Sequence, residues 1–327
     1  MSTGARRTEM GVLALIACWV ILVPLTGSRF WMYNLTIVSL YATVVVSLNL
    51  LLGYAGQVSF AQTTFMAIGG YGSAILTKRW GIDPWLAIMA AAAFAVVCAL
   101  LIGLPLLRLR GHYLALATFA LALGTTRFAS GATALTNGSI GISAVPPLTL
   151  GRAVFGPPGY YVLGWLVCAV ATLAVVALAD SHVGRAWRAL AVRADVAATL
   201  GIDVNRYKLL ALAIAALIAS VAGSLYVEFA TFVGPDLYDI GTIINLFIML
   251  FIGGLGSIAG PVVGSMIVIV IPQLIAGLER YQNLVFFTLL LALILVRPAG
   301  LFGRSREPAP LTAILPAWVR RHRMEAR

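Results

Sequence analysis

The chain has 327 residues, of which 61% are hydrophobic and only 10% are charged. Soluble domains carry about 25% charged residues, so this composition excludes a soluble globular protein and predicts a polytopic membrane protein. A net charge of +11 can indicate nucleic-acid binding. Here the basic residues lie between apolar runs and in the C-terminal tail, so we expect contact with the lipid bilayer and no nucleic-acid partner.

Ten apolar runs approach the roughly 20 residues that a helix needs to cross a bilayer. The predicted spans are 10–26, 33–52, 59–77, 84–104, 113–130, 160–179, 209–230, 241–260, 261–278 and 283–297. The first follows Arg6 and Arg7 and imitates a secretory signal, but nine spans follow it, so we expect an uncleaved helix. The sequence therefore predicts an all-α membrane domain over 1–303, with about ten transmembrane helices, and a basic tail over 304–327.

The basic residues predict the orientation of these spans. With ten spans, 16 Lys and Arg residues lie on the side of the N-terminus and 5 on the opposite side, and Arg127 is left at the end of a span. The positive-inside rule then places both termini in the cytoplasm. Two connections are long, an external one over 131–159 and a cytoplasmic one over 180–208.

The cytoplasmic connection contains a polar, helix-like segment. One helical stripe, at spacings of four and three, is formed by Val183, Trp187, Leu190, Ala194 and Ala197. Arg185, Arg188 and Asp195 point away from that stripe, and Gly201 can end the helix. Two interpretations are open: a surface helix among lipid headgroups, or a docking surface for a cytoplasmic partner.

Several polar side chains interrupt the apolar spans. They are Gln57, Ser59, Gln62, Thr63 and Thr64 at the start of the third span, Glu228 near the external end of the seventh, and Asn245 in the eighth. Buried polar groups cost free energy unless they are satisfied. These residues therefore either hydrogen-bond between helices or line a translocation pathway, and the start of the third span could be re-entrant. Glu228 either reaches the membrane surface or serves as a gate.

A glycine motif occurs twice. The sequence "IGGYGS" over 68–73, with Gly69 and Gly70, recurs as "IGGLGS" over 252–257, with Gly253, Gly254 and Gly256. Equivalent positions in two halves of five spans suggest an inverted repeat, as in many transporters. Gly260 and Pro261 separate the eighth and ninth spans, so the chain is expected to turn there. The glycines serve either close helix packing or hinges.

The chain lacks the residues of an energy-converting or catalytic site. Its only lysines, Lys78 and Lys208, follow Thr77 and Tyr207, so neither belongs to a phosphate-binding P-loop. Cys18, Cys98 and Cys168 lie in three separate apolar runs, which favours packing over metal binding. We therefore expect no enzyme activity, no catalytic residue, no metal and no cofactor.

Motifs spread over most of 35–303 resemble the LivM-type branched-chain amino acid permeases of ATP-binding-cassette importers. They are "LLGYAGQVSFAQTTFMAIGGYG", "GLPLLRLRGHYLALATFALA", "LTNGSIGI", "GRAWRALAVRADVAATLGI", "IASVAGSLY", "FIGGLGSIAGPVVGS" and "VRPAGLFG". Asn137 stands where the family pattern has glycine, and Asn tolerates the left-handed backbone conformation that such a position favours.

The resemblance implies that the polar segment fits a groove on a cytosolic ATPase. Trp187 and Leu190 would be packing anchors, Arg185 and Arg188 would make polar contacts, and Gly184 would give clearance. Asp195 and Gly201 complete this set of coupling residues.

The resemblance also implies the partners and the location. The chain would pair with a homologous permease, two cytosolic ATP-binding subunits and an extracytoplasmic substrate-binding protein in the bacterial inner membrane. Three alternatives remain: an ion-coupled secondary transporter with a site among Gln57, Gln62 and Asn245, a passive channel, and a related permease for urea or short amides.

Overall fold

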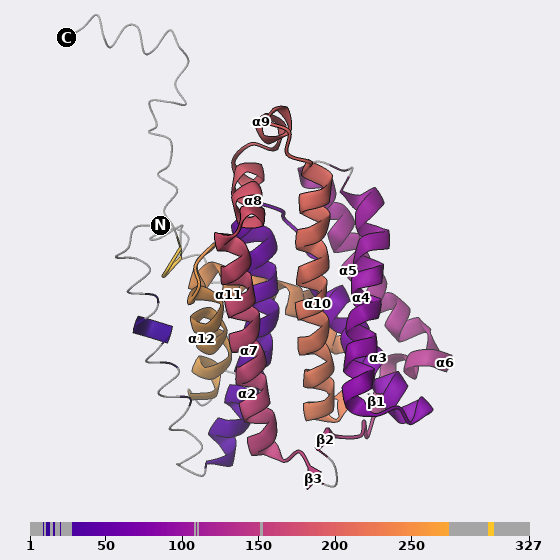
Figure 1. The fold of residues 1–327 in the computed structure, drawn as a ribbon. Helices are drawn as coiled ribbons and strands as arrows, with labels where there is room; N and C mark the ends of the chain where they lie inside the picture. Colours follow the sequence, from indigo (N-terminus) through magenta and orange to yellow (C-terminus); the bar gives the residue numbers. More distant parts are fainter. Residues whose placement is uncertain are drawn as a thin grey trace, which may run out of the picture.

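The computed structural model describes residues 9, 11–13, 16, 20, 28–107, 109, 111–150, 153–274 and 300–303. This part of the chain is a bundle of long helices with a few very short strands (Figure 1). The elements in chain order are α2 (Arg29–Asn49), η2 (Leu50–Tyr54), α3 (Gln62–Trp80), α4 (Pro84–Leu106), α5 (His112–Gly131), α6 (Thr133–Thr136), η3 (Gly138–Ile140), β1 (Ile142–Ser143), β2 (Thr149–Leu150), β3 (Ala153–Val154), α7 (Pro157–Asp180), α8 (His182–Val192), α9 (Ala194–Thr199), α10 (Val204–Ala230), β4 (Phe232–Val233), η4 (Pro235–Tyr238), α11 (Ile240–Gly253) and α12 (Gly260–Leu274).

The second to seventh predicted spans are confirmed as helices. Five helices in the described part are long and apolar enough to cross a membrane: Arg29–Tyr54, Pro84–Leu106, His112–Gly131, Pro157–Asp180 and Val204–Ala230. The third predicted span forms the 19-residue helix α3, which carries several polar residues. The tenth span, the tail over 304–327 and most of the first span lie outside the described residues.

Several helices begin at short polar residues that bind their free N–H groups. Asp83 accepts from the N–H of Trp85 at the start of α4, and Asp203 and Asp239 cap α10 and α11 in the same way. A carboxylate there satisfies an unpaired donor and interacts favourably with the helix dipole. These caps define the residue at which each helix begins.

The helices α3 and α10 pack closely in the core. A Cβ atom at Gly69 would overlap the carbonyl oxygen of Ser220, and one at Gly223 would overlap that of Met66. The two backbones therefore touch where small residues allow it. Most residues of α2 and α10 are buried, whereas α4, α5 and α7 expose large apolar side chains, as lipid-facing helices do.

The predicted turn between the eighth and ninth spans is displaced. The chain leaves the helix at Gly254, with φ of 107°, and re-enters a helix at Gly260. Pro261 therefore lies in the first turn of α12, where its missing N–H costs nothing. The prediction of a turn at Gly260-Pro261 was wrong, since the turn is made by residues 254–259 and leaves two short helices of 14 and 15 residues.

The two copies of the glycine motif also differ in conformation. The first lies inside the continuous helix α3, whereas the second covers the end of α11 and the loop after it. Gly256 has φ of 70°, a left-handed conformation that favours glycine. A five-plus-five inverted repeat stays a prediction, because the first and tenth spans are largely outside the described residues.

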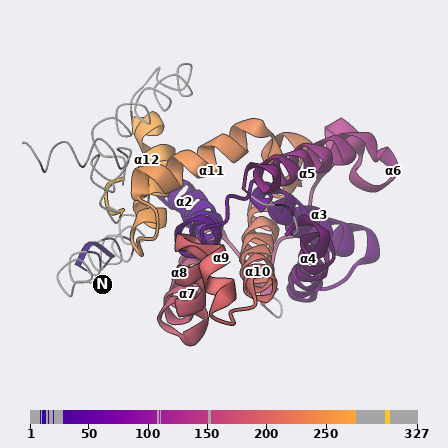
Figure 2. The ribbon, with the colours of Figure 1, turned by 90° about the horizontal axis from the view of Figure 1, so that it is seen from above.

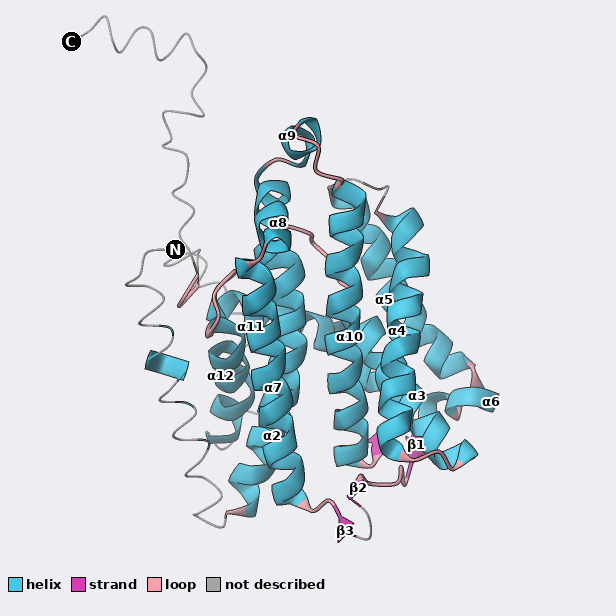
Figure 3. Ribbon diagram, viewed as in Figure 1, coloured by secondary structure: helices cyan, strands magenta, loops and turns pink. Residues whose placement is uncertain are grey.

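The two ends of the bundle differ (Figure 3). At one end β1 pairs with β4 and β2 with β3, and this strand end is tied to α3 by Lys78, whose ammonium donates to the carbonyl of Ser143 in β1. At the opposite end lie α8 and α9. Seen from above, α11 lies across the bundle between α12 and α5 (Figure 2).

Candidate functional site

The segment α8–α9 is anchored to its own chain by the residues of its apolar stripe. Trp187 is fully buried, and its Nε1 donates to the carbonyl of Tyr207 at 2.8 Å. Leu190 is also buried, and a Cβ at Gly184 would overlap the carbonyl of Ala179. Trp187 and Leu190 therefore anchor the segment by packing inward against their own chain, and their role in coupling to an ATPase stays a prediction.

The predicted single helix is broken in two. Ser181 caps α8 by accepting from the N–H of Val183, and the helix stops at Arg193, whose backbone is extended with φ of −153° and ψ of 104°. After that residue α9 continues for six residues. The break turns the second half of the segment outward, over the top of the bundle (Figure 1).

Outward-facing residues of α8, α9 and the turn after them form what we call the α8–α9 surface. It consists of Arg185, Arg188, Val192, Arg193, Asp195, Val196, Leu200 and Gly201, all exposed. Val192 and Leu200 are 75% and 76% exposed. Neither residue belongs to the predicted apolar stripe of Val183, Trp187, Leu190, Ala194 and Ala197. Exposed apolar residues among cations are typical of a protein contact surface.

A second group of polar residues lies in the interior, along α3, α10 and η4. The buried side-chain atoms there without a hydrogen-bond partner in the described structure belong to Gln57, Gln62, Thr63, Tyr71, Ser220, Ser224, Glu228 and Tyr238. Of the predicted pathway residues, the structure thus places Gln57, Gln62 and Glu228 in this group. Unsatisfied polar groups are costly in an apolar interior. They are spread along the bundle, since a Cβ at Gly56, beside Gln57, would meet Ala191 of α8, whereas the rings of Tyr71 and Tyr238 are in contact farther along α3.

Other polar residues at the start of α3 have structural partners. The Ser59 hydroxyl accepts from the N–H of Ala61 at 3.3 Å, and the Thr125 hydroxyl donates to that of Thr64 at 3.1 Å. The stretch from Ala55 to Ala61 is irregular rather than helical. Ser59 therefore shapes the turn into α3.

Glu228 is fully buried, which disfavours the first of its two alternatives, a side chain that reaches the membrane surface; a role as a gate stays a prediction. Neither carboxyl oxygen has a hydrogen-bond partner in the described structure. Asp83 and Tyr160 interact with it electrostatically. In the same region, burial, followed by the proximity of Tyr71, raises the pKa of the Tyr238 phenol well above its usual range, so this group remains a proton donor.

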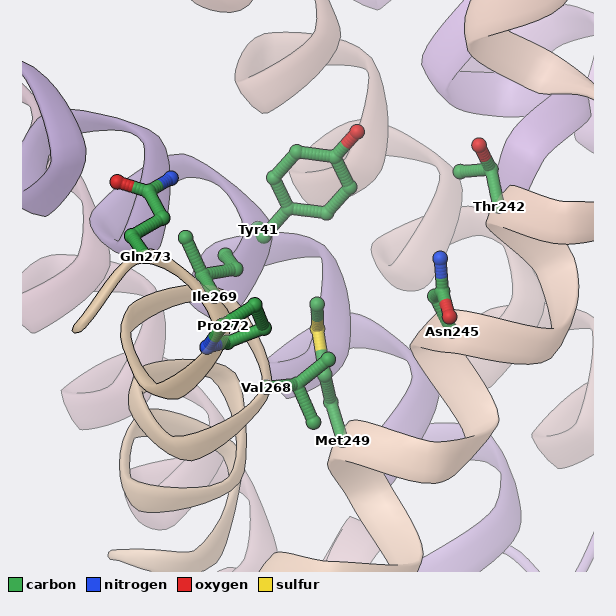
Figure 4. A pocket seen from close by; sticks show the side chains of 8 residues that line it. All are labelled: Tyr41, Thr242, Asn245, Met249, Val268, Ile269, Pro272 and Gln273. Atoms are coloured by element: carbon green, nitrogen blue, oxygen red, sulfur yellow. The ribbon is translucent and has the colours of Figure 1, made fainter. Parts of the chain in front are cut away.

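Asn245 lies elsewhere, in a pocket between α2, α11 and α12 (Figure 4). The lining residues are Tyr41, Thr242, Asn245, Met249, Val268, Ile269, Pro272 and Gln273. Gln57 and Gln62 are not among these lining residues, so the pocket does not contain the three amides expected to act together.

The loop between α11 and α12 is held by a residue that sequence reasoning missed. The Asn49 amide accepts from the N–H of Gly256 and donates to the carbonyl of Ser257, both at 2.8 Å. A Cβ at Gly53 would overlap the Asn49 side chain. The sequence does contain a signal, because Asn49 stands in an apolar run. An amide that is buried there must find hydrogen-bond partners.

These features define the chain as a multi-pass, all-α membrane protein with polar groups inside its bundle and a basic, partly apolar surface at one end. The model of the family described as "Branched-chain amino acid transport system / permease component" matches residues 31–295. The chain therefore belongs to this family and is a membrane permease.

Relatives with assigned names agree with this membership. The chain is 26% identical over 326 residues to the high-affinity branched-chain amino acid transport system permease protein LivM of Escherichia coli K12, covering 92% of this chain and 76% of LivM. It is 30% identical over 294 residues to LivH of the same organism, covering 84% and 94% of the two chains. It is 29% identical to the permease protein BraD of Pseudomonas aeruginosa, over 83% and 94%. No solved structure gives a significant match.

Proposed function

We propose that this chain is the permease subunit of an ATP-binding-cassette importer that carries branched-chain amino acids across the bacterial inner membrane. The observation that carries the proposal is the α8–α9 surface, where Val192, Val196 and Leu200 are exposed beside Arg188 on a segment anchored from below by Trp187. A rigidly held apolar patch suits a partner that must pass a movement to the membrane helices.

The assembly contains four further subunits. Two cytosolic ATPases dock on the α8–α9 end of the permeases and supply the energy, since this chain has no phosphate-binding loop. A second, homologous permease completes the transmembrane pair, and both LivM and LivH are permease proteins with detectable similarity to this chain. A substrate-binding protein delivers the amino acid at the strand end. The permease itself catalyses no reaction and holds no cofactor.

The rival functions make different demands on the structure. An ion-coupled transporter needs a coupling site among Gln57, Gln62 and Asn245, yet the pocket that contains Asn245 is lined by other residues. A passive channel needs no partner at the α8–α9 surface. A permease for urea or short amides has the same architecture, so only uptake measurements distinguish it.

The test alters the exposed apolar residues and leaves the buried anchors intact. We expect the double variant Val192→Asp, Leu200→Asp to insert and fold normally but to lose the ATPase subunits on purification and to lose leucine uptake. The control for ATPase docking is Val154→Asp, which places the same charge at a 62% exposed valine at the opposite end and should retain the ATPase subunits on purification.

Retention of the ATPases and of uptake by the double variant would contradict the proposal. So would normal uptake of urea with no uptake of leucine, isoleucine or valine by the wild-type assembly.

A further inference from the structure

The pocket between α2, α11 and α12 has the dimensions of a small-molecule site. Its volume is about 350 Å³, within the range of about 300–1,000 Å³ typical of such sites. Side chains of α11 lie on one side of it and those of α12 on the other, with Tyr41 of α2 between them (Figure 4).

One part of the pocket wall is apolar. Met249 comes from α11, and Val268, Ile269 and Pro272 come from α12. Met249 and Val268 are 3% and 1% exposed, so the wall is continuous with the protein core. Such a wall favours an aliphatic side chain, because a branched hydrocarbon removes apolar surface from water when it packs there.

The rest of the wall carries amides and hydroxyls. Asn245 and Gln273 each provide donors and an acceptor, and Tyr41 and Thr242 provide hydroxyls. Pro272 has no N–H to donate to the carbonyl of Val268, four residues earlier, so a backbone acceptor is released within the pocket lining. These groups complement both an ammonium group and a carboxylate.

No Lys, Arg, Asp or Glu is found among the described lining residues. Asp239 lies close by, since it accepts from the N–H of Thr242 and interacts electrostatically with Tyr41, but it does not line the pocket. A ligand with a net charge would therefore lack a counter-ion in the pocket wall itself, whereas a zwitterion can be held by dipoles alone. The two amides also disfavour a lipid acyl chain, which would leave them without partners.

We infer that this pocket is a transient binding site for a neutral aliphatic amino acid, with its charged groups held by Asn245, Gln273 and the Val268 carbonyl and its side chain against Met249 and Ile269. This inference rests on the proposed transport function and assigns the place of the substrate within this chain.

The first experiment locates the substrate directly. The complete transporter, with both permeases, the ATPases and the binding protein, is reconstituted in nanodiscs with photo-leucine, a leucine analogue that carries a diazirine. After irradiation, mass spectrometry identifies the labelled peptides. We expect labels within 240–253 or 260–274, suppressed by excess leucine and unaffected by excess lysine or aspartate.

The second experiment measures leucine uptake by variants in proteoliposomes. Asn245→Leu keeps nearly the same volume and removes the amide, and uptake is expected to fall at least about tenfold, because a hydrogen bond to a charged group is lost. Met249→Trp fills the pocket and should abolish uptake. Met89→Trp on the lipid-exposed face of α4, where Met89 is 69% exposed, should change uptake by no more than about twofold.

The outcomes separate the two proposals. If the wild-type assembly takes up no leucine, the proposed function fails, and this inference fails with it. If the wild type takes up leucine but Asn245→Leu transports equally well and no label reaches α11 or α12, the inference alone is overturned. Labelling of the pocket by a photoreactive acyl lipid in place of photo-leucine would also overturn it.

Discussion

At the scale of single residues, two kinds of position constrain the structure: glycines where helices touch, and buried polar groups without hydrogen-bond partners in the described part of the chain. Gly69 and Gly223 are required by distance, because any Cβ there meets backbone, which cannot rotate away. Glu228 is the opposite case, because burying its carboxyl group without a hydrogen-bond partner costs free energy.

The contact between Gly69 and Ser220 predicts that a larger side chain at residue 69 destabilises the protein. Gly69→Ala should force α3 and α10 apart and destabilise the protein by about 1–3 kcal/mol, the usual cost of overpacking. Gly124→Ala in α5 is the matched control, since nothing lies within 4 Å of its added Cβ, and it should be neutral or slightly stabilising. Thermal unfolding of the purified permease measures both, and equal melting temperatures would refute the close contact.

Glu228→Gln should separate stability from transport. The amide keeps the shape of the side chain and removes the possibility of a buried unpaired charge, so the melting temperature should stay the same or rise by a few degrees. If Glu228 acts in the pathway, leucine uptake by the assembled transporter should nevertheless fall. A lower melting temperature would instead mean that the carboxyl group stabilises the fold.

At the scale of elements, hydropathy gave the wrong boundary between α11 and α12, because it does not show the loop that joins these two helices. Two apolar runs separated by glycine become two short helices, and a Cβ at Gly264 would overlap the carbonyl of Met249 where they cross. The loop between them has polar backbone that must be satisfied within the protein. Asn49 of α2 provides the partners.

Substitution of Asn49 should therefore destabilise this unit, and the size of the effect should depend on which hydrogen bonds the new side chain retains. Asn49→Leu leaves the Gly256 N–H and the Ser257 carbonyl without their partner, at about 1–3 kcal/mol for each group. Asn49→Asp retains the acceptor for Gly256 but turns a carboxylate oxygen toward the Ser257 carbonyl, so burial of the charge adds to the lost bond and the destabilisation should exceed that of one hydrogen bond. Melting temperatures and hydrogen exchange at residues 254–259 measure the series, and wild-type protection in Asn49→Leu would contradict it.

At the scale of the whole molecule, the bundle has two chemically distinct ends. The α8–α9 end carries the Arg residues of the polar segment, and the strand end carries the two small β-pairs. The proposed function places the first in the cytoplasm and the second outside.

Cysteine labelling in whole cells tests this orientation. In a background with the native cysteines replaced, Val154→Cys should react with a membrane-impermeant maleimide in intact cells. Leu200→Cys, at a position that is 76% exposed against 62% for Val154, should react only after permeabilisation. Reaction of Leu200→Cys in intact cells would invert the proposed topology.

Hydropathy alone determined much of this architecture. Six predicted spans over 33–230 became helices because a long apolar run in lipid can satisfy its backbone in only one common way. The polar segment over 180–208 was also found from local pattern, because a charged stretch stands out in such a chain. The family followed from motifs in a fixed order.

Tertiary structure decided which way the side chains face. The stripe with Trp187 and Leu190 was correctly recognised as apolar, yet spacing cannot tell whether a stripe meets the same chain or another one. The position of Tyr207, 20 residues further along, settles that for Trp187. In the same way, the pocket around Asn245 joins α2 to α11 and α12, and a contact between residues about 200 positions apart leaves no periodic signal in the sequence.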